Sequence, residues 1–281
     1  MLNKIKITIS TIIIPTDFST VADNALRYGI DMAKQYNFQI LLYHVVQLST
    51  ANFSHIVYVE DIDKIMTEHK DAMKNKMEKL KLENPNVDFE YDVEAGLLFD
   101  NLSLKCEKIK PIAVLMGITG SGALDKFIGS NAVLAIKHLP CPVMIIPKSA
   151  KFTPIKNICL ACDLKNVLQS TPLLSIKVFT KIFNAKIHIL NVDYKNKNFS
   201  AQTPEELQNL EYIFDDLPHD LHFVEYENVQ NAITDFVDSE NIDLLMMVPK
   251  KHTFFESLFQ KSNSKEMAYE THIPILNLQQ V

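Results

Sequence analysis

Short apolar runs alternate with amphipathic segments along the first half of the chain. The apolar or alternating runs end in turn residues and predict strands at residues 11–17, 39–46, 87–93, 112–116 and 142–147. Apolar residues recur at helical spacing between them, which predicts helices at residues 19–35, 61–82, 98–109 and 130–139. Strands that alternate with helices indicate right-handed parallel crossovers, and therefore an α/β sheet covered by helices on both faces.

The same order of elements restarts in the second half. Strands are expected at residues 155–163, 186–192, 221–226, 243–248 and 273–278. Helices are expected at residues 173–183, 204–217, 229–239 and 262–269. The first strand of each half ends in an acid, and these two acids, Asp17 and Asp163, lie 146 positions apart. The pattern indicates an internal duplication, and the polar segment after residue 148 predicts domains at residues 1–148 and 154–281.

Composition excludes several classes of protein. The 281 residues are 47% hydrophobic and 22% charged, which is ordinary for globular protein of about two domains. A net charge of −6 argues against a nucleic-acid partner, which usually meets a basic face. No apolar run approaches the ~20 residues of a membrane span, so no membrane partner is expected. The four cysteines are too few for a disulfide scaffold, which favours a reducing, cytoplasmic location.

Glycine is rare and unevenly distributed. All six glycines lie in the first half, and four fall within the thirteen residues from Gly117 to Gly129. This loop follows the fourth predicted strand and ends at a helix start, where free backbone N–H groups and the helix dipole favour phosphate. With strand order 3-2-1-4-5, the loop adjoins Asp17 at the switch point where such sheets bind ligands. The pattern predicts a nucleotide or small anionic ligand here, although a helix cap by Asp17 and a simple tight turn remain open.

These motifs resemble the universal stress protein family in its tandem two-domain form. The resemblance rests on residues 14–19 (Ile-Pro-Thr-Asp-Phe-Ser), 41–45, 116–120 and 129–143, and it extends over nearly the whole chain. It implies two Rossmann-like, adenine nucleotide alpha hydrolase-like domains, each with a five-stranded parallel sheet of order 3-2-1-4-5. It also implies that the last strands, at 142–147 and 273–278, pair and so join the two domains within one chain. A homodimer of the whole chain is a further expectation.

The resemblance also implies which residues bind the nucleotide. Adenine and ribose would be surrounded by Pro15, Thr16, Asp17 and Ile40. The phosphate side would be lined by Met116, Gly117, Thr119, Gly120, Gly129, Ser130 and Asn131. ATP-binding members carry Gly-x2-Gly-x9-Gly-Ser/Thr, whereas eight residues separate Gly120 from Gly129 here. The corresponding stretch of the second half has no glycine and places Val248, Lys251 and Lys261 there, so this half is interpreted as having lost the site.

Two functions follow from these observations. The first is a stress-response regulatory protein that binds ATP, with Mg²⁺, or a related nucleotide in its N-terminal domain only, without efficient catalysis. The second is a nucleotide-free scaffold that acts through protein contacts, with both sites degenerate; the shortened glycine spacing favours it. The residues offer no confident general base, so no catalytic residue is predicted, and slow nucleotide hydrolysis is a third hypothesis. No other cofactor is expected.

The remaining motifs have structural interpretations. Cys159 and Cys162 lie on a predicted strand, where positions i and i+3 point to opposite faces, so the pair is interpreted as core packing. His44 and His188 also lie in predicted strands and are interpreted as packed or hydrogen-bonded, and no metal site is predicted. The basic and aromatic segment 249–259, with Lys250-Lys251-His252, is interpreted as a loop folded on its own domain; a docking or anion site is the alternative.

Overall fold

The computed structural model describes residues 10–47, 59–118, 130–194, 203–227, 229–248 and 272–279. Contacts group the chain into two compact units. One unit consists of Met1–Met116 with Lys137–Cys141, and the other of Gly117–Ile136 with Pro142–Val281. The helix predicted at residues 262–269 and most of the glycine loop lie outside the described residues.

The first half of the chain forms a parallel sheet with the strand order β3-β2-β1-β4-β5. Its strands are β1 (Thr11–Pro15), β2 (Gln39–Val46), β3 (Asp88–Ala95), β4 (Ala113–Gly117) and β5 (Val143–Ile146). Its helices are α1 (Thr20–Tyr36), α2 (Val59–Glu83), α3 (Leu98–Ile109) and α4 (Ser130–His138). β1 pairs in parallel with β2 and β4, which places the ends of β1 and β4 side by side and confirms the predicted order.

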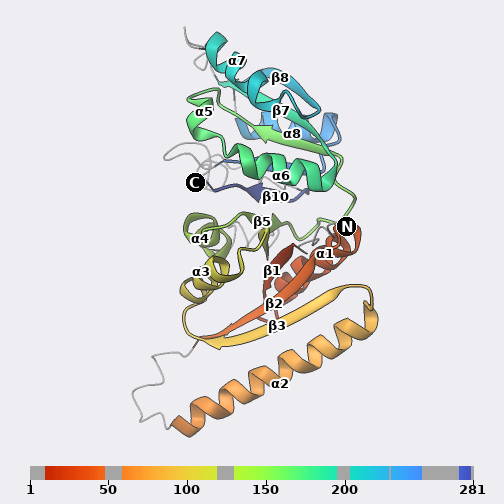
Figure 1. The fold of residues 1–281 in the computed structure, drawn as a ribbon, viewed down its shortest axis with the longest axis vertical. Helices are drawn as coiled ribbons and strands as arrows, with labels where there is room; N and C mark the ends of the chain where they lie inside the picture. Colours follow the sequence, from red (N-terminus) through yellow and green to blue (C-terminus); the bar gives the residue numbers. More distant parts are fainter. Residues whose placement is uncertain are drawn as a thin grey trace, which may run out of the picture. The chain divides into compact units, whose positions relative to one another are not determined.

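Helices cover both faces of this sheet. His44 and Tyr43 are neighbours on β2, so their side chains point to opposite faces. His44 contacts His69 of α2, whereas the Tyr43 ring lies under the ammonium of Lys105, on α3. Figure 1 shows α2 running alongside β3, at the end of this sheet. Ser19 is the N-cap of α1, and its side chain accepts a hydrogen bond from the backbone of Ala22, as predicted.

The second half repeats this arrangement. Its strands β6 (Asn157–Ala161), β7 (Lys186–Tyr194), β8 (His219–Tyr226), β9 (Leu244–Met247) and β10 (Ile275–Asn277) follow the order β8-β7-β6-β9-β10. The helices among the described residues are α5 (Val167–Ser170), α6 (Leu173–Phe183), α7 (Thr203–Phe214) and α8 (Val229–Ser239). β5 pairs antiparallel with β10, so the expected pairing of these two segments is present.

The short helix α5 is not predicted from the sequence. The backbone N–H groups of Asn166 and Val167 donate to the two carboxylate oxygens of Glu206, on α7, at 3.0 and 2.8 Å. A distant carboxylate therefore satisfies the start of a helix that has no side-chain cap of its own. Such a partner cannot be recognised from the local pattern.

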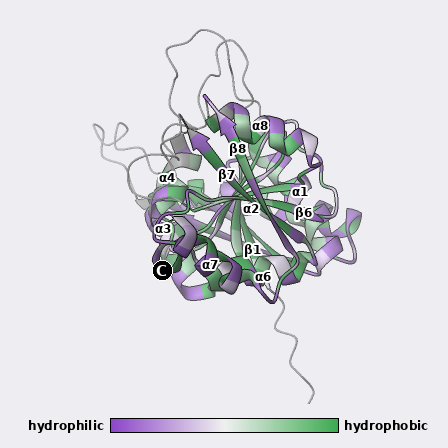
Figure 2. Cartoon of the chain, turned by 90° about the horizontal axis from the view of Figure 1, so that it is seen from above, coloured by the Kyte–Doolittle hydropathy of each residue, from purple (hydrophilic) through white to green (hydrophobic). Residues whose placement is uncertain are grey.

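The cores are built from the strands. Ile12, Ile13 and Ile14 of β1 are fully buried, as are all four residues of β5 and, within 1% of exposure, of β9. Figure 2 shows hydrophobic residues gathered on the strands and hydrophilic residues on the outer sides of the helices. Among the described residues, no helix combines the length and the apolar character needed to cross a membrane.

Candidate functional site

The turn after β1 is held by its own backbone and side chains. The N–H of Thr16 donates to the carbonyl of Tyr43 at 2.8 Å, and the Thr16 hydroxyl accepts from the N–H of Phe18 at 3.1 Å. Phe18 takes a left-handed conformation with φ of 62°. The N–H of Ser19 then donates to Oδ1 of Asp17 at 2.9 Å. This turn fixes the Asp17 carboxylate at the carboxyl end of β1.

Asp17 is a charged group at this edge. Partial burial would raise the pKa of its carboxyl, but the hydrogen bonds from Ser19 outweigh burial and hold the pKa below its usual value. The carboxylate is therefore ionised at neutral pH. Ser19, and not Asp17, caps α1, so capping of the helix does not explain the acid at position 17.

A pair of hydrogen-bonded histidines, His44 and His69, contacts this turn. Nδ1 of His44 lies 2.6 Å from the carbonyl oxygen of Thr16, and its Nε2 lies 2.8 Å from Nδ1 of His69. A carbonyl only accepts, so Nδ1 of His44 carries the proton and Nε2 accepts from His69. Burial, reinforced by His69, lowers the pKa of His44 despite the opposing Thr16 carbonyl. The Phe18 ring packs on His44 with centroids 4.8 Å apart.

The sequence-based expectation that His44 is hydrogen-bonded is confirmed, but His69 and Phe18 were not predicted. His69 carries a usable signal. It follows Met66 by three positions and precedes Met73 by four, so the helical spacing places it on the inward face.

The structure brings some of the predicted ligand contacts together. Ile13 pairs with Val114, so Pro15 and Met116, two positions further on, lie at the same level of adjacent strands. Gly117 ends β4, and Asn131 is exposed in the first turn of α4. Three other predicted residues, Thr119, Gly120 and Gly129, lie outside the described residues, and Ser130 is described only as the first residue of α4.

Ile40 is the exception. It pairs with Ile12, three positions before Pro15, and is fully buried. At ~3.3 Å per residue, this places it about 10 Å along the strand from the end of β1. The structure therefore does not bring Ile40 to the edge that carries Asp17. The Ile40 side chain therefore packs in the core and does not line the predicted ligand site.

The second half keeps the turn after its first strand. Oδ1 of Asp163 accepts from the N–H of Lys165 at 3.2 Å, and Leu164 is left-handed with φ of 53°. The amide of Asn191 donates to the carbonyl of Cys162 at 2.9 Å, as His44 does to Thr16. The two halves therefore share this turn, whereas Lys251, Lys261 and the 250–252 loop lie outside the described residues.

The cysteines are free thiols. Cys159 is fully buried in β6, and burial raises the pKa of its thiol, which agrees with the prediction of core packing. Cys162 was predicted on the same strand, but it follows the end of β6 and is half-buried, so the prediction for the pair holds for Cys159 alone. Sγ of Cys141 lies 3.2 Å from Sγ of Cys106, and both side chains are buried. The contact with Cys106, followed by burial, raises the pKa of Cys141. The thiols of Cys141 and Cys159 are therefore protonated at neutral pH.

Residues 8–147 match the sequence model of the Universal stress protein family. A universal stress protein of Methanocaldococcus jannaschii is 28% identical over 142 residues, which are 50% of this chain and 83% of the relative. A universal stress protein structure from Archaeoglobus fulgidus matches with a TM-score of 0.69 and 17% identity, covering 96% of this chain and 98% of that chain. A protein of unknown function from Pseudomonas aeruginosa matches with a TM-score of 0.58 and 11% identity, covering 97% of this chain and 93% of that one.

The two solved structures establish the fold over both halves, and the matched residues contain the turn that holds Asp17. The repeated strand order and the repeated turn agree with a tandem arrangement. The family match and the curated relative therefore place the first half of the chain in the universal stress protein family.

Proposed function

We propose that the first half binds ATP or a related adenine nucleotide, and that binding regulates the protein in the stress response without efficient turnover. The observation that carries the proposal is the ionised Asp17 carboxylate, fixed at the end of β1 where the neighbouring strand is β4. The N–H of Ser19 donates to Oδ1, and the carboxylate is proposed to accept from a ribose hydroxyl as well. The switch point between β1 and β4 is where open α/β sheets place their ligands.

The start of α4 supplies the other half of the proposed site. α4 begins at Ser130, after the glycine loop that follows β4. The free N–H groups of its first turn and its dipole favour the phosphates, with Mg²⁺ as the counterion in the cell. Pro15, Thr16, Met116 and Gly117 are proposed to line the approach, and Thr119, Gly120, Gly129, Ser130 and Asn131 the phosphate side. Ile40 lies outside this ligand-facing group.

The second half is proposed to bind no nucleotide, although it keeps the Asp163 turn. Its stretch after β9 contains none of the family's glycines and carries Lys251 and Lys261 instead. The proposed domains remain residues 1–148 and 154–281. A homodimer of the whole chain is also proposed.

The shared turn provides a matched pair of variants. Protein purified without added ligand is examined by native mass spectrometry and then titrated calorimetrically with ATP. We expect one nucleotide per chain at most, and Asp17→Ala to weaken binding about ten- to a hundredfold, since a hydrogen bond to a charged group contributes about 1.5–3 kcal/mol. Asp163→Ala removes the equivalent carboxylate of the second half and should leave binding unchanged.

The alternative is a nucleotide-free scaffold, favoured by the eight residues between Gly120 and Gly129 where ATP-binding members have nine. It predicts no nucleotide in the native spectrum and no binding heat at millimolar ATP. Equal losses in Asp17→Ala and Asp163→Ala would contradict the proposal that only the first half binds. Native mass spectrometry reports the oligomeric state in the same experiment.

A further inference from the structure

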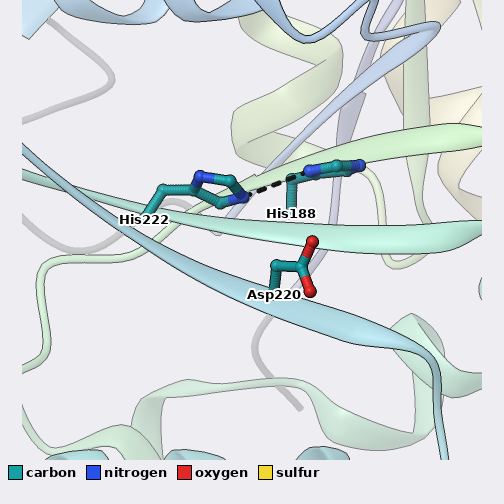
Figure 3. A group of neighbouring side chains, drawn as sticks. All are labelled: His188, Asp220 and His222. Carbon is teal, nitrogen blue, oxygen red and sulfur yellow. Dashed lines mark hydrogen bonds between the residues drawn. The ribbon is translucent and has the colours of Figure 1, made fainter.

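Three side chains with metal-binding atoms gather on one face of the second-half sheet: His188 on β7, and Asp220 and His222 on β8 (Figure 3). His188 pairs directly with Asp220 across the two parallel strands. Asp220 and His222 are two positions apart, so they share a face of the sheet. We call these three residues the His-Asp-His cluster.

The atoms of the cluster are spaced as metal ligands are. Nδ1 of His188 lies 3.2 Å from Nε2 of His222, and all three ligand atoms lie within 4.8 Å of one another. Two ligands at ~2.1 Å from a tetrahedral zinc ion are about 3.4 Å apart. The two imidazole nitrogens are therefore already separated by about the distance that a shared ion requires, and the ligand atom of the carboxylate lies within 4.8 Å of both.

A second contact orients the buried histidine. Nε2 of His188 lies 3.4 Å from Oδ1 of Asn157. Nδ2 of Asn157 donates to the carbonyl of Asn241 at 3.3 Å. This hydrogen bond orients the amide so that Oδ1 of Asn157 faces the His188 ring. With the proton on Nε2, Nδ1 presents a lone pair to His222. Ligating histidines commonly give their other N–H to such an acceptor, which fixes the tautomer.

The His-Asp-His cluster is buried from solvent on the side of His188 and exposed to solvent on the side of Asp220. His188 is 6% exposed, and the ring of Phe236, on α8, packs edge-on against His188 and His222 with centroids 6.4 and 4.8 Å away. His222 is half-buried and Asp220 is exposed. A bound ion would therefore keep coordination positions for water.

One cation already competes for the carboxylate. Nζ of Lys186 forms an ion pair with Oδ2 of Asp220. A metal ion must share the carboxylate with this ammonium or displace it. The cluster lies near the amino ends of β7 and β8, whereas Asp163 follows the carboxyl end of β6, so it is separate from the turn that corresponds to the nucleotide site.

We propose that the His-Asp-His cluster binds one divalent transition-metal ion of the zinc type, with water completing the coordination. Two imidazole nitrogens and one carboxylate suit zinc or cobalt, whereas magnesium and calcium prefer oxygen ligands throughout. This proposal does not depend on the nucleotide site.

The test uses the full chain after chelator treatment, titrated with Zn²⁺ against a chromophoric chelator and separately with Co²⁺. We expect one ion per chain and a cobalt visible spectrum without the thiolate-to-metal band that cysteine ligands produce. His222→Ala and Asp220→Asn should each weaken binding by at least about tenfold. Lys186→Met removes the competing cation and should tighten binding.

His219→Ala is the matched control. His219 precedes Asp220 on β8, points to the opposite face and contacts Glu211 instead, at 3.1 Å. It should bind Zn²⁺ as the unaltered chain does, and circular dichroism verifies that each variant is folded. Unchanged affinity in His222→Ala and Asp220→Asn, a thiolate band in the cobalt spectrum, or no stoichiometric binding at micromolar Zn²⁺ would overturn the proposal.

Discussion

Lys105 offers the sharpest test of how the first-half sheet is stabilised. Its side chain is 9% exposed, and Nζ lies 2.7 Å from Oδ2 of Asp92 and 2.5 Å from Oε1 of Glu94. Glu94 also accepts from the hydroxyl of Tyr43 at 2.6 Å and from the amide of Asn101 at 3.2 Å. Lys105→Met keeps most of the buried stem but removes the charge, leaving two carboxylates on one face of β3 without their shared cation.

The expected loss lies between two known limits. Breaking a fully buried ion pair costs about 3–5 kcal/mol, and losing an exposed pair costs about 0.2–1 kcal/mol. The lysine is buried, but the side chains of Asp92 and Glu94 are 43% and 35% exposed, so solvent screens each pair. We therefore expect Lys105→Met to lower the free energy of unfolding by about 2 kcal/mol.

The assay is urea unfolding followed by far-ultraviolet circular dichroism, because the chain has no tryptophan. A loss of about 2 kcal/mol moves the midpoint by about 1 M for a slope near 2 kcal/mol/M. A double-mutant cycle with Glu94→Gln should give a coupling of about 1 kcal/mol. The control is Lys79→Met, whose 3.8 Å pair with Glu83 is 75% and 54% exposed and should contribute less than about 0.5 kcal/mol.

The same pair has a pH signature. Burial would raise the pKa of Glu94, but its hydrogen bonds with Lys105, Tyr43 and Asn101 hold the pKa below its usual 4.5. A lowered carboxyl pKa stabilises the fold above the unfolded value, and this stabilisation is lost as the pH falls through the folded value. The difference between the unaltered chain and Lys105→Met should therefore shrink below about pH 4. A midpoint equal to that of Lys79→Met, or a coupling near zero, would refute this reasoning.

Two further predictions concern the same unit. Gly96→Ala should lower the free energy of unfolding by about 1–3 kcal/mol, because Gly96 has φ of +145° and an added Cβ would collide with the side chain of Asn101. Urea unfolding should show no comparable loss for Leu97→Ala, because Leu97 is 66% exposed. Burial lowers the pKa of His44 below 6.5, so folding favours its neutral form and stability should fall as the pH drops below about 6.5. Melting temperatures between about pH 7.5 and 5 should fall less steeply for His44→Gln, and equal slopes would contradict this account.

Local patterns predicted most of the fold correctly. The strand at residues 39–46 and the helices at 98–109, 173–183 and 229–239 have the predicted bounds. Each is one uninterrupted apolar run or one uninterrupted amphipathic segment, so its ends are visible in the sequence. The pairing of the last strands was also expected, on the resemblance to tandem universal stress proteins. The helix α5 was missed, since Glu206, almost forty positions away, satisfies its first N–H groups.

The candidate sites divide in the same way. The position of Asp17 just after β1 was predicted, because an acid that follows a buried strand is a local signal; its role in binding a ligand stays a prediction. Ile40 follows from a motif resemblance, but strand register places it opposite Ile12, in the interior. The His-Asp-His cluster was not predicted, and the sequence spacing explains why: 32 positions separate His188 from Asp220, and only the pairing of β7 with β8 makes them neighbours.

The pairing of β5 with β10 has a consequence for synthesis of the chain. β5 ends at Ile146, but its antiparallel partner begins only at Ile275. During translation at ~5–20 residues per second, this edge of β5 emerges well before the segment that will cover it. An apolar strand whose edge N–H and C=O groups are unpaired can pair with a strand of another nascent chain. We therefore expect the edge of β5 to depend most on chaperones in a ribosome-bound intermediate stalled before residue 275.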